Sequence, residues 1–176
     1  MTTRPIAATF ILALFAVSST ALLADSAAGI RWTAPVEWKA QAARPMRAAT
    51  YSVTPAAGDR GVAECVVNYF GPGQGGTIDA NVERWKGQVL GADGKPAAAK
   101  VSSRTVRGVR ITVVDSAGGY TGMGGPMAAN AKPVSGYRLL GAIAEGPGGN
   151  VFFKLTGPEK TIAAERQRFD QLLASI

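Results

Sequence analysis

Short apolar runs, separated by turns rich in glycine and proline, are the feature that most constrains how this chain can fold. Glycine contributes 22 and proline 10 of the 176 residues, and both gather between the apolar runs. Glycine tolerates positive φ and proline lacks a backbone N–H, so both favour turns and interrupt long helices. The pattern predicts short elements within one domain, and apolar residues, at 47% of the chain, are sufficient to form its core.

Turn signals between neighbouring runs predict β-hairpins. Runs in which apolar side chains alternate or follow one another indicate strands, and the two-residue link Arg107-Gly108 is typical of a tight hairpin turn. The run at 62–70 is largely apolar on both faces, which predicts a central strand. Three pairs of runs are expected to form hairpins: 47–54 with 62–70, 101–106 with 109–115, and 137–145 with 151–156.

Two further segments have the apolar spacing of helices. The first follows Thr77, a suitable N-cap residue, and is expected to end at Gly91. The second is expected to carry Pro158 in its first turn and to run to the C-terminus. Hairpins dominate and no β-α-β unit repeats, so the expected fold class is α+β, a mainly antiparallel sheet of hairpins with two main helices packed on it. The inward residues are Ile78, Val82, Trp85 and Val89 in the first helix, and Ile162, Phe169, Leu172, Leu173 and Ile176 in the second.

The N-terminal segment has the features of an export signal. Arg4 supplies a positive charge, residues 6–24 are apolar apart from a few hydroxyl residues, and small residues follow. We therefore expect a signal peptide at 1–28, a single α+β domain at 29–176, and a periplasmic or secreted mature protein. The alternative is a retained membrane anchor, because 19 residues could just span a bilayer. Beyond the leader no stretch reaches the roughly 20 apolar residues of a membrane helix, so no transmembrane segment is expected there.

The position of cleavage stays open among three bonds. Cleavage after Ala28, with Ser26 three residues from the cut, and cleavage after Ser26, with Ala24 there, both fit the preference for small residues. Cleavage after Ala24 is also possible, but it places the bulkier Leu22 at that position.

The chain is basic, with a net charge of +7 that removal of the leader leaves unchanged, since Arg4 and Asp25 go together. A basic surface attracts anionic partners. We expect an unknown envelope protein or an anionic ligand rather than nucleic acid, because Lys and Arg are scattered and the protein is expected outside the cytoplasm. The alternative is an ordinary solvated basic surface.

The chain has no histidine and one cysteine, Cys65. Ser–His and Cys–His dyads, histidine metal ligation and imidazole proton transfer are therefore excluded. A single thiol cannot form an internal disulfide, and Cys65 lies inside an apolar run, so we expect it to be buried and inert rather than reactive. No catalytic residue, cofactor or metal is predicted.

The order of elements resembles the PsbP-like fold, which occurs in an extrinsic subunit of photosystem II and in many uncharacterised exported bacterial proteins. The resemblance extends over about residues 30–176. It implies a central antiparallel sheet flanked by helices and a binding or accessory function, and no metal ligands can be carried over. It rests on Trp32-(x)2-Pro35-(x)2-Trp38, Met46–Tyr51, Phe70-Gly71-(x)-Gly73-Gln74-Gly75-Gly76, Asn81-(x)2-Arg84-Trp85 and Phe152–Pro158 leading to Phe169-(x)5-Ser175.

One weak ligand site is predicted, where a glycine-rich loop leads into the first helix. Free N–H groups at a helix N-terminus can hold an anion, and a glutamine amide can add two polar contacts. The loop lacks the lysine of a phosphate-binding P-loop. Instead of an anion, the loop could contact a glycan or a protein partner, or it could be a mobile surface turn. The alternative for Arg84 is a solvated or salt-bridged side chain, and Trp85 is expected in the core. The predicted ligand-binding residues are Gly73, Gln74, Gly75, Gly76, Asn81 and Arg84.

Three other features are weaker candidates. Glu64 and Asp115 lie in predicted strands and could face one another as an acid–base pair, although carboxylates with basic neighbours are the simpler interpretation. The segment 122–135 is either a binding lid or a disordered loop. A basic group around one hairpin, which could meet an anionic surface or protect a sheet edge, consists of Lys100, Arg104, Arg107 and Arg110.

The functional expectation is a non-catalytic exported binding or accessory module of the cell envelope. The alternative is a carboxylate-dependent envelope hydrolase that uses Glu64 and Asp115. A third hypothesis is an adhesive envelope component held by charge, which salt would release.

Overall fold

The computed structural model describes residues 25–122 and 132–176. Residues 1–24, which make up most of the predicted signal peptide, and residues 123–131, the middle of the segment predicted as a lid or disordered loop, lie outside the described residues. In the described ranges, no helix has the length and apolar character needed to cross a membrane.

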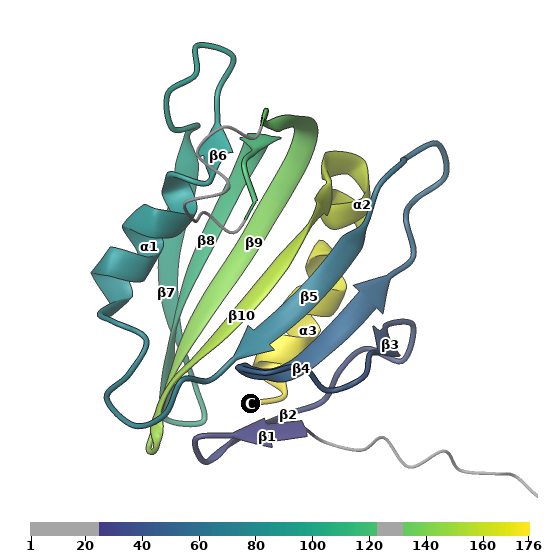
Figure 1. Cartoon of the computed structure of the whole chain (residues 1–176). Coiled ribbons are helices and arrows are strands. Elements are labelled where there is room, and N and C mark those ends of the chain that lie inside the picture. Colours follow the sequence, from purple (N-terminus) through teal and green to yellow (C-terminus); the bar gives the residue numbers. More distant parts are fainter. Residues whose placement is uncertain (1–24, 123–131) are drawn as a thin grey trace, which may run out of the picture.

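A large antiparallel sheet forms the centre of the molecule (Figure 1). Its strand order is β3-β4-β5-β10-β9-β8-β6, and β7 also pairs with β8. A separate two-stranded sheet at the N-terminal end consists of β1 (Asp25–Ala27) and β2 (Ile30–Trp32). The strands of the large sheet are β3 (Lys39–Ala40), β4 (Arg47–Val53), β5 (Ala63–Asn68), β6 (Val89–Leu90), β7 (Ala99–Val106), β8 (Val109–Tyr120), β9 (Val134–Gly146) and β10 (Gly149–Pro158).

The three predicted hairpins are confirmed as β4–β5, β7–β8 and β9–β10. Arg107 and Gly108 both have positive φ, at 45° and 86°, as a tight two-residue turn requires. Segment 62–70 is an interior strand as predicted, since β5 lies between β4 and β10. The α+β fold class and the mainly antiparallel sheet are therefore correct.

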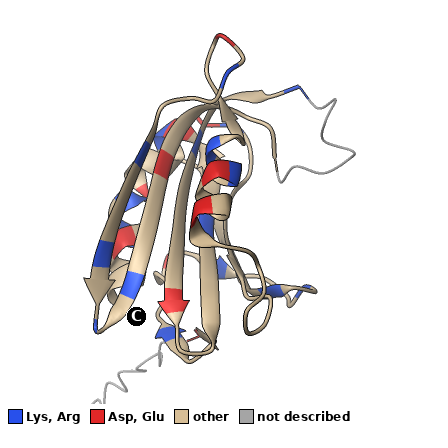
Figure 2. Ribbon diagram, turned by 90° about the vertical axis from the view of Figure 1, so that its left-hand side faces the viewer, with Lys and Arg blue, Asp and Glu red and all other residues tan. Residues whose placement is uncertain are grey.

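Helices cover the two faces of the sheet unequally. The helix α1 (Ile78–Lys86) lies on one face, and α2 (Glu159–Ala164) and α3 (Arg166–Ala174) lie on the other (Figure 2). The C-terminal segment thus forms two short helices where the sequence predicts one. Pro158 is the last residue of β10, paired with Tyr137, and not part of the first helical turn.

The first helix is also shorter than predicted. It ends at Lys86, and Val89, expected on the apolar stripe of this helix, is fully buried in β6 opposite Tyr120. Gly87 is the last residue whose N–H bonds back into the helix in the α-helical pattern, to the carbonyl of Glu83. Beyond it, pairing with β8 competes successfully with further helix, which suits β-branched Val89.

The larger core lies between the sheet and the α2–α3 layer. Cross-strand partners share one face of a sheet, so the row Tyr51, Cys65, Leu155 and Leu140 points into this core. Cys65 is fully buried, and burial raises the pKa of its thiol far above the ordinary range. The prediction that Cys65 is buried is confirmed.

A smaller cluster lies between α1 and the opposite face, and Trp85 is its central residue. Trp85 is 3% exposed, which confirms that it belongs to a core. Its ring lies directly on Gly141 of β9, where a Cβ atom would be 2.4 Å from Cε3 and Cζ3 of the indole. The absence of a side chain at residue 141 therefore sets how closely α1 approaches the sheet. The cluster consists of Val82, Trp85, Val89, Val114, Leu139, Ile143 and Phe152.

We expect Gly141→Ala to lower the free energy of unfolding by about 1–3 kcal/mol, because the added methyl group must displace the indole ring of Trp85. The measurement is urea denaturation followed by tryptophan fluorescence. Gly87→Ala is the matched control, since a Cβ atom there meets nothing closer than 3.5 Å and φ is −68°. Equal stability of the two variants would contradict this account of the helix–sheet contact.

Candidate functional site

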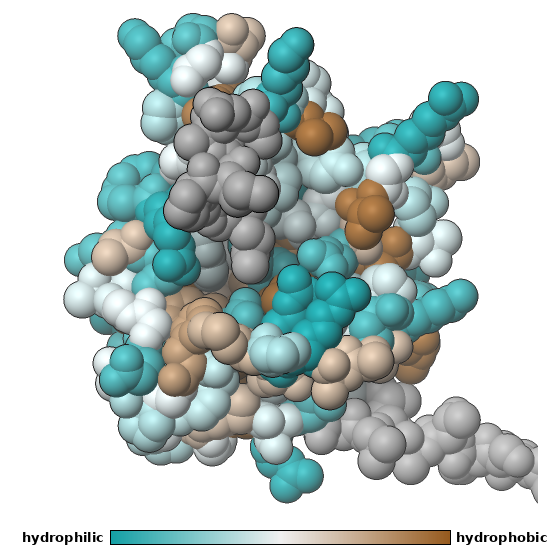
Figure 3. Space-filling model, in the orientation of Figure 1, coloured by the Kyte–Doolittle hydropathy of each residue, from teal (hydrophilic) through white to brown (hydrophobic). Residues whose placement is uncertain are grey.

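A cavity of about 360 Å³ opens on the sheet face that α1 only partly covers. It lies between α1 and the strands β4, β5 and β10. Figure 3 looks onto this face and shows strongly hydrophilic side chains near its centre. The residues that line the cavity are Pro45, Met46, Arg47, Asn68, Phe70, Arg84, Trp85, Gln88, Phe152 and Lys154.

Strand register brings the sheet side of the cavity together. Arg47 of β4 is the partner of Asn68 of β5, and Asn68 is in turn the partner of Phe152 of β10. These three side chains form a row across the sheet. Lys154 follows Phe152 by two residues, so both point to the same face. Arg47 and Lys154 are more than 100 positions apart in the chain, yet both lie on this floor, because β5 pairs with β4 on one side and with β10 on the other.

The opposite wall comes from α1 and the turn that follows it. Arg84, Trp85 and Gln88 are spaced so that they lie on one side of the helix end. The Trp85 ring meets the Phe152 ring edge to face, with 6.5 Å between centroids, and Phe70 packs against Phe152 at 5.6 Å. Three aromatic rings thus form an apolar part of the cavity, next to the polar groups.

Lys154 is the most unusual residue of the cavity, because only 6% of it is exposed. Its ammonium group lies 3.4 Å from Oε1 of Gln88 and 3.3 Å from the hydroxyl oxygen of Tyr120. Burial lowers the pKa of Lys154 to about 8, and the charges of Arg84 and Arg47 act in the same direction, against that of Glu64. Arg47, Arg84 and Lys154 thus bring three basic side chains to the lining of one cavity.

The predicted glycine-rich loop has a structural role beside this cavity. Gly73, Gln74, Gly75 and Gly76 are not among the lining residues. The N–H of Gln74 bonds to the carbonyl of Gly71 and forms a turn, and Gly75 packs closely against Phe152 and Phe70. The four loop residues that were predicted to bind a ligand therefore do not line this cavity.

Asn81 and Arg84 connect the loop to the cavity. The Asn81 side chain, 2% exposed, donates to the carbonyls of Gly75 and Thr77 at 2.8 Å. Its Oδ1 accepts a hydrogen bond from Arg84. Arg84 is the predicted site residue that lines the cavity, and Asn81 holds it in place. Thr77 caps α1 as predicted, accepting from the N–H of Ala80.

Sequence reasoning missed Arg47, Gln88 and Lys154. A signal for Lys154 was present, because a lysine inside the apolar run Val151–Leu155 contradicts the expected composition of a central strand. Arg47 and Gln88 carried no comparable signal. Their place depends on strand register and on the end of α1, which only the folded chain defines.

The two candidate carboxylates do not form a pair. Asp115 faces the α2–α3 layer, in the row that contains Leu140, Leu155 and Cys65. Glu64 is one residue along from Cys65 and points to the other face. Two strands and the thickness of the sheet separate the carboxylates, so the expectation that they could face one another is wrong.

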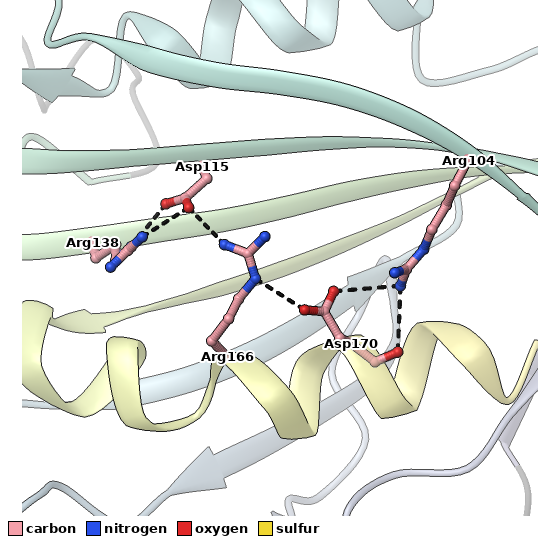
Figure 4. Close-up of polar contacts among 5 residues, drawn as sticks. All are labelled: Arg104, Asp115, Arg138, Arg166 and Asp170. Carbon is pink, nitrogen blue, oxygen red and sulfur yellow. Dashed lines mark hydrogen bonds and ion pairs between the residues drawn. The ribbon is translucent and has the colours of Figure 1, made fainter.

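Asp115 is instead the centre of an ion-pair network under α3 (Figure 4). Arg138 donates two bonds of 2.8 Å to its carboxylate, and Arg166 donates a third of 2.6 Å. Arg166 continues to Asp170 at 3.1 Å, and Arg104 reaches Asp170 at 3.4 Å. Burial raises the pKa of Asp115, but the two arginines lower it by more, so the pKa lies below the ordinary value.

The predicted basic group on the β7–β8 hairpin is largely engaged in structural contacts. Besides Arg104, Arg110 pairs with Glu145 at 3.5 Å, and Arg107 donates to the carbonyls of Ser175 and Ile176. Lys100 is exposed on β7. Three of the four cations therefore tie the hairpin to its surroundings.

The structure describes only part of the segment that was predicted to be a lid or a disordered loop. Of the segment 122–135, the structure describes Gly122 and residues 132–135, and Val134 and Ser135 belong to β9. Among the described residues, no group of three or more Cys, Asp and Glu side chains is arranged to hold a metal.

Comparisons with known proteins identify neither a family nor a function. No protein-family model and no curated protein matches the chain. One similar solved structure is that of PA94 from Pseudomonas aeruginosa, described as a protein of unknown function and a suggested regulator. The sequences are 13% identical, the TM-score is 0.47, and the match covers 88% of this chain and 94% of the other.

We expect Asp115→Asn to lower the free energy of unfolding by about 1–3 kcal/mol at pH 7, because two arginines lose their shared anion. The folded-state pKa lies below the unfolded value of about 3.9, so the contribution is present above pH 4 and is lost as the pH falls through the folded pKa. Asp170→Asn is the control, since the Asp170 side chain is 37% exposed against 11% for Asp115, and it should cost less than about 1 kcal/mol. The check is urea denaturation from pH 7 down to pH 3; a variant penalty that persists unchanged into acid would contradict it.

Lys154 should make the free energy of unfolding depend on pH in the alkaline range, because burial disfavours its charged form. Its folded pKa of about 8 lies below the unfolded value, so between these two values the unfolded chain binds more protons and stability rises with pH. Relative to Lys154→Met, the wild type should gain about 2–3 kcal/mol between pH 7 and pH 10.5. Lys100→Met, at an exposed strand position, is the control and should run parallel to the wild type. Parallel curves for all three proteins would disprove the lowered pKa.

Proposed function

We propose that this protein is a non-catalytic binding module of the cell envelope that holds a small organic anion in the cavity beside α1. The observation that carries the proposal is the composition of the cavity. Three cations, Arg47, Arg84 and Lys154, line one space together with three aromatic rings. Ligand sites commonly combine an apolar wall with a few polar groups in this way.

The charge of the lining favours an anion. Among the residues that the structure describes, those lining the cavity include three cations and no carboxylate. The nearest carboxylate to Arg47 is that of Glu64, 3.7 Å away and outside the lining. An anionic ligand would stabilise the charged form of Lys154 and offset the cost of its burial. Arginine side chains also suit a planar carboxylate, which they can bind with two parallel bonds.

The apolar part of the lining favours a ligand with an aromatic or short aliphatic body. Phe70, Trp85 and Phe152 pack against one another and form an apolar wall of the cavity, which suits an apolar body better than a free inorganic anion. The volume of about 360 Å³ lies at the lower end of the range for small-molecule sites. These features together favour a small amphiphilic anion.

Binding is favoured over hydrolysis by the placement of the carboxylates. Acid–base hydrolysis of a glycosidic bond needs two carboxyl groups at a set separation around one substrate. Glu64 and Asp115 point to opposite faces of the sheet, and Asp115 is engaged by two arginines. The envelope location and the PsbP-like fold in this proposal rest on the leader and on the sequence resemblance alone.

The test is calorimetric titration with three probes: 1-naphthylacetate, its neutral alcohol 2-(1-naphthyl)ethanol, and inorganic phosphate. We expect the carboxylate to bind at least about tenfold more tightly than either of the others, equivalent to about 1.4 kcal/mol. Its affinity should fall above pH 8, as Lys154 loses its proton. Equal affinity for the alcohol, or no binding of any probe, would overturn the proposal.

Cavity variants locate the binding. Arg47→Gln, Arg84→Gln and Lys154→Met should each weaken naphthylacetate binding about tenfold or more, since each removes one cation from the lining. Arg110→Gln is the matched control, because Arg110 is exposed and pairs with Glu145 away from the cavity. A loss of affinity in the control equal to that in the cavity variants would place the binding elsewhere.

A charge-held adhesive role is the competing hypothesis, and the basic surface is its support. Binding to phosphatidylglycerol vesicles that disappears between about 0.05 and 0.5 M salt, and that all three cavity variants retain, would favour it. Naphthylacetate binding that depends on the cavity would favour the proposed function.

A further inference from the structure

The N-terminal hairpin is built into the folded domain, although the predicted signal peptide at 1–28 includes its first strand. β1 pairs with β2 through three residue pairs: Asp25 with Trp32, Ser26 with Arg31, and Ala27 with Ile30. Ala28 and Gly29 form the turn, with φ of 54° and 76°. The hairpin lies at the end of the molecule where the β9–β10 turn is also found (Figure 1).

Contacts on both sides of the turn hold this hairpin in place. The N–H of Gly148 donates to the carbonyl of Ala28 at 2.9 Å. Ile30 and Trp32 of β2 are 2% and 1% exposed and belong to the larger core. Ala27 and Ala28 pack against that core from its edge. Residues 25–28 therefore take part in the tertiary structure.

Asp25 ends a chain of hydrogen bonds that begins in the core. Trp32 Nε1 donates to the hydroxyl oxygen of Tyr51 at 2.8 Å, and the Tyr51 hydroxyl donates to the carboxylate of Asp25. Tyr51 is 2% exposed, and burial together with the hydrogen bond to Asp25 raises the pKa of its phenol far above the ordinary value. A buried hydroxyl needs an acceptor for its proton, and Asp25 supplies it.

We infer that the leader is removed at the Ala24–Asp25 bond, so that the mature domain begins with Asp25 and keeps β1. This inference rests on the export that forms part of the proposed function. Hydrolysis adds water across the amide bond, leaving a carboxylate on Ala24 and a new amino group on Asp25. Cleavage after Ser26 would remove the acceptor of Tyr51, and cleavage after Ala28 would remove all of β1.

Local sequence preference favours the other two bonds. Cleavage after Ser26 or after Ala28 would have a small residue directly before the cut and another three residues before it. Cleavage after Ala24 places the larger Leu22 three residues before the cut. The contacts that residues 25–28 make in the folded domain favour their retention.

The first experiment expresses the full chain in a bacterium, recovers the exported protein from the periplasm, and determines its intact mass and N-terminal sequence. We expect the sequence to begin Asp25-Ser26-Ala27. A protein that begins at Ala27 or Gly29, or that retains Met1, would overturn the inference. Retention of Met1 in the cytosol would also remove the export on which the envelope role rests, whereas naphthylacetate binding is measured independently of processing.

Leader variants of the full chain identify the bond that is cut. Ala24→Leu should leave at least about tenfold more unprocessed precursor than the wild type, because a bulky residue next to the cut is not accepted. Ser26→Leu and Ala28→Leu are the matched controls and should be processed like the wild type. Accumulation of precursor with either control would assign the cut to one of the later bonds, whatever the result with Ala24→Leu, because residue 24 also lies at the favoured position before a cut after Ser26.

Discussion

The register of β10 determines which side chains face each layer of the molecule. This strand pairs with β5 on one side and β9 on the other, so the alternation of its side chains is shared by the whole centre of the sheet. Phe153 and Leu155 enter the larger core, and Phe152 and Lys154 face α1. A slip of one residue would exchange these two sets, placing the lysine in the core and the apolar side chains at the cavity.

The two faces of the sheet have different partners, and this difference produces the cavity. On one face, the α2–α3 layer packs on the sheet and encloses the larger core. Ion pairs of Asp115 with Arg138 and Arg166 connect this layer to β8 and β9. On the other face α1 is a single short helix, held down by Trp85 on Gly141. Beside α1, side chains from β4, β5 and β10 line the cavity, and two of their polar members, Arg47 and Lys154, are cationic.

Much of the fold was predictable because its signals are local. Turn chemistry at Arg107-Gly108 and the apolar runs around it identify hairpins without knowledge of the rest of the chain. Errors appear where tertiary contacts override local preference. Val89 suits a helical stripe but pairs with β8, and Pro158 suits a helical first turn but completes β10. In both cases a neighbouring strand offers hydrogen bonds that the local sequence does not reveal.

The candidate site was less predictable than the fold. Asn81 and Arg84 were identified from a glycine-rich loop, yet the loop holds the helix in place and only Arg84 reaches the cavity. The other cations, Arg47 and Lys154, lie far from Arg84 in the sequence. The carboxylates Glu64 and Asp115, which looked alike as strand residues, are separated by the sheet because neighbouring strand positions alternate between faces.

By itself the sequence determined the α+β class, the three hairpins, the buried thiol and the lack of any histidine-based chemistry. These follow from composition and from side-chain patterns a few residues long. Only the tertiary structure decided which charges meet: it brought three cations to one cavity, surrounded Asp115 with arginines and bonded Asp25 to Tyr51. The physical reason is that strand pairing joins residues distant in the chain, and its register is set by burial of the whole sheet rather than by any one segment.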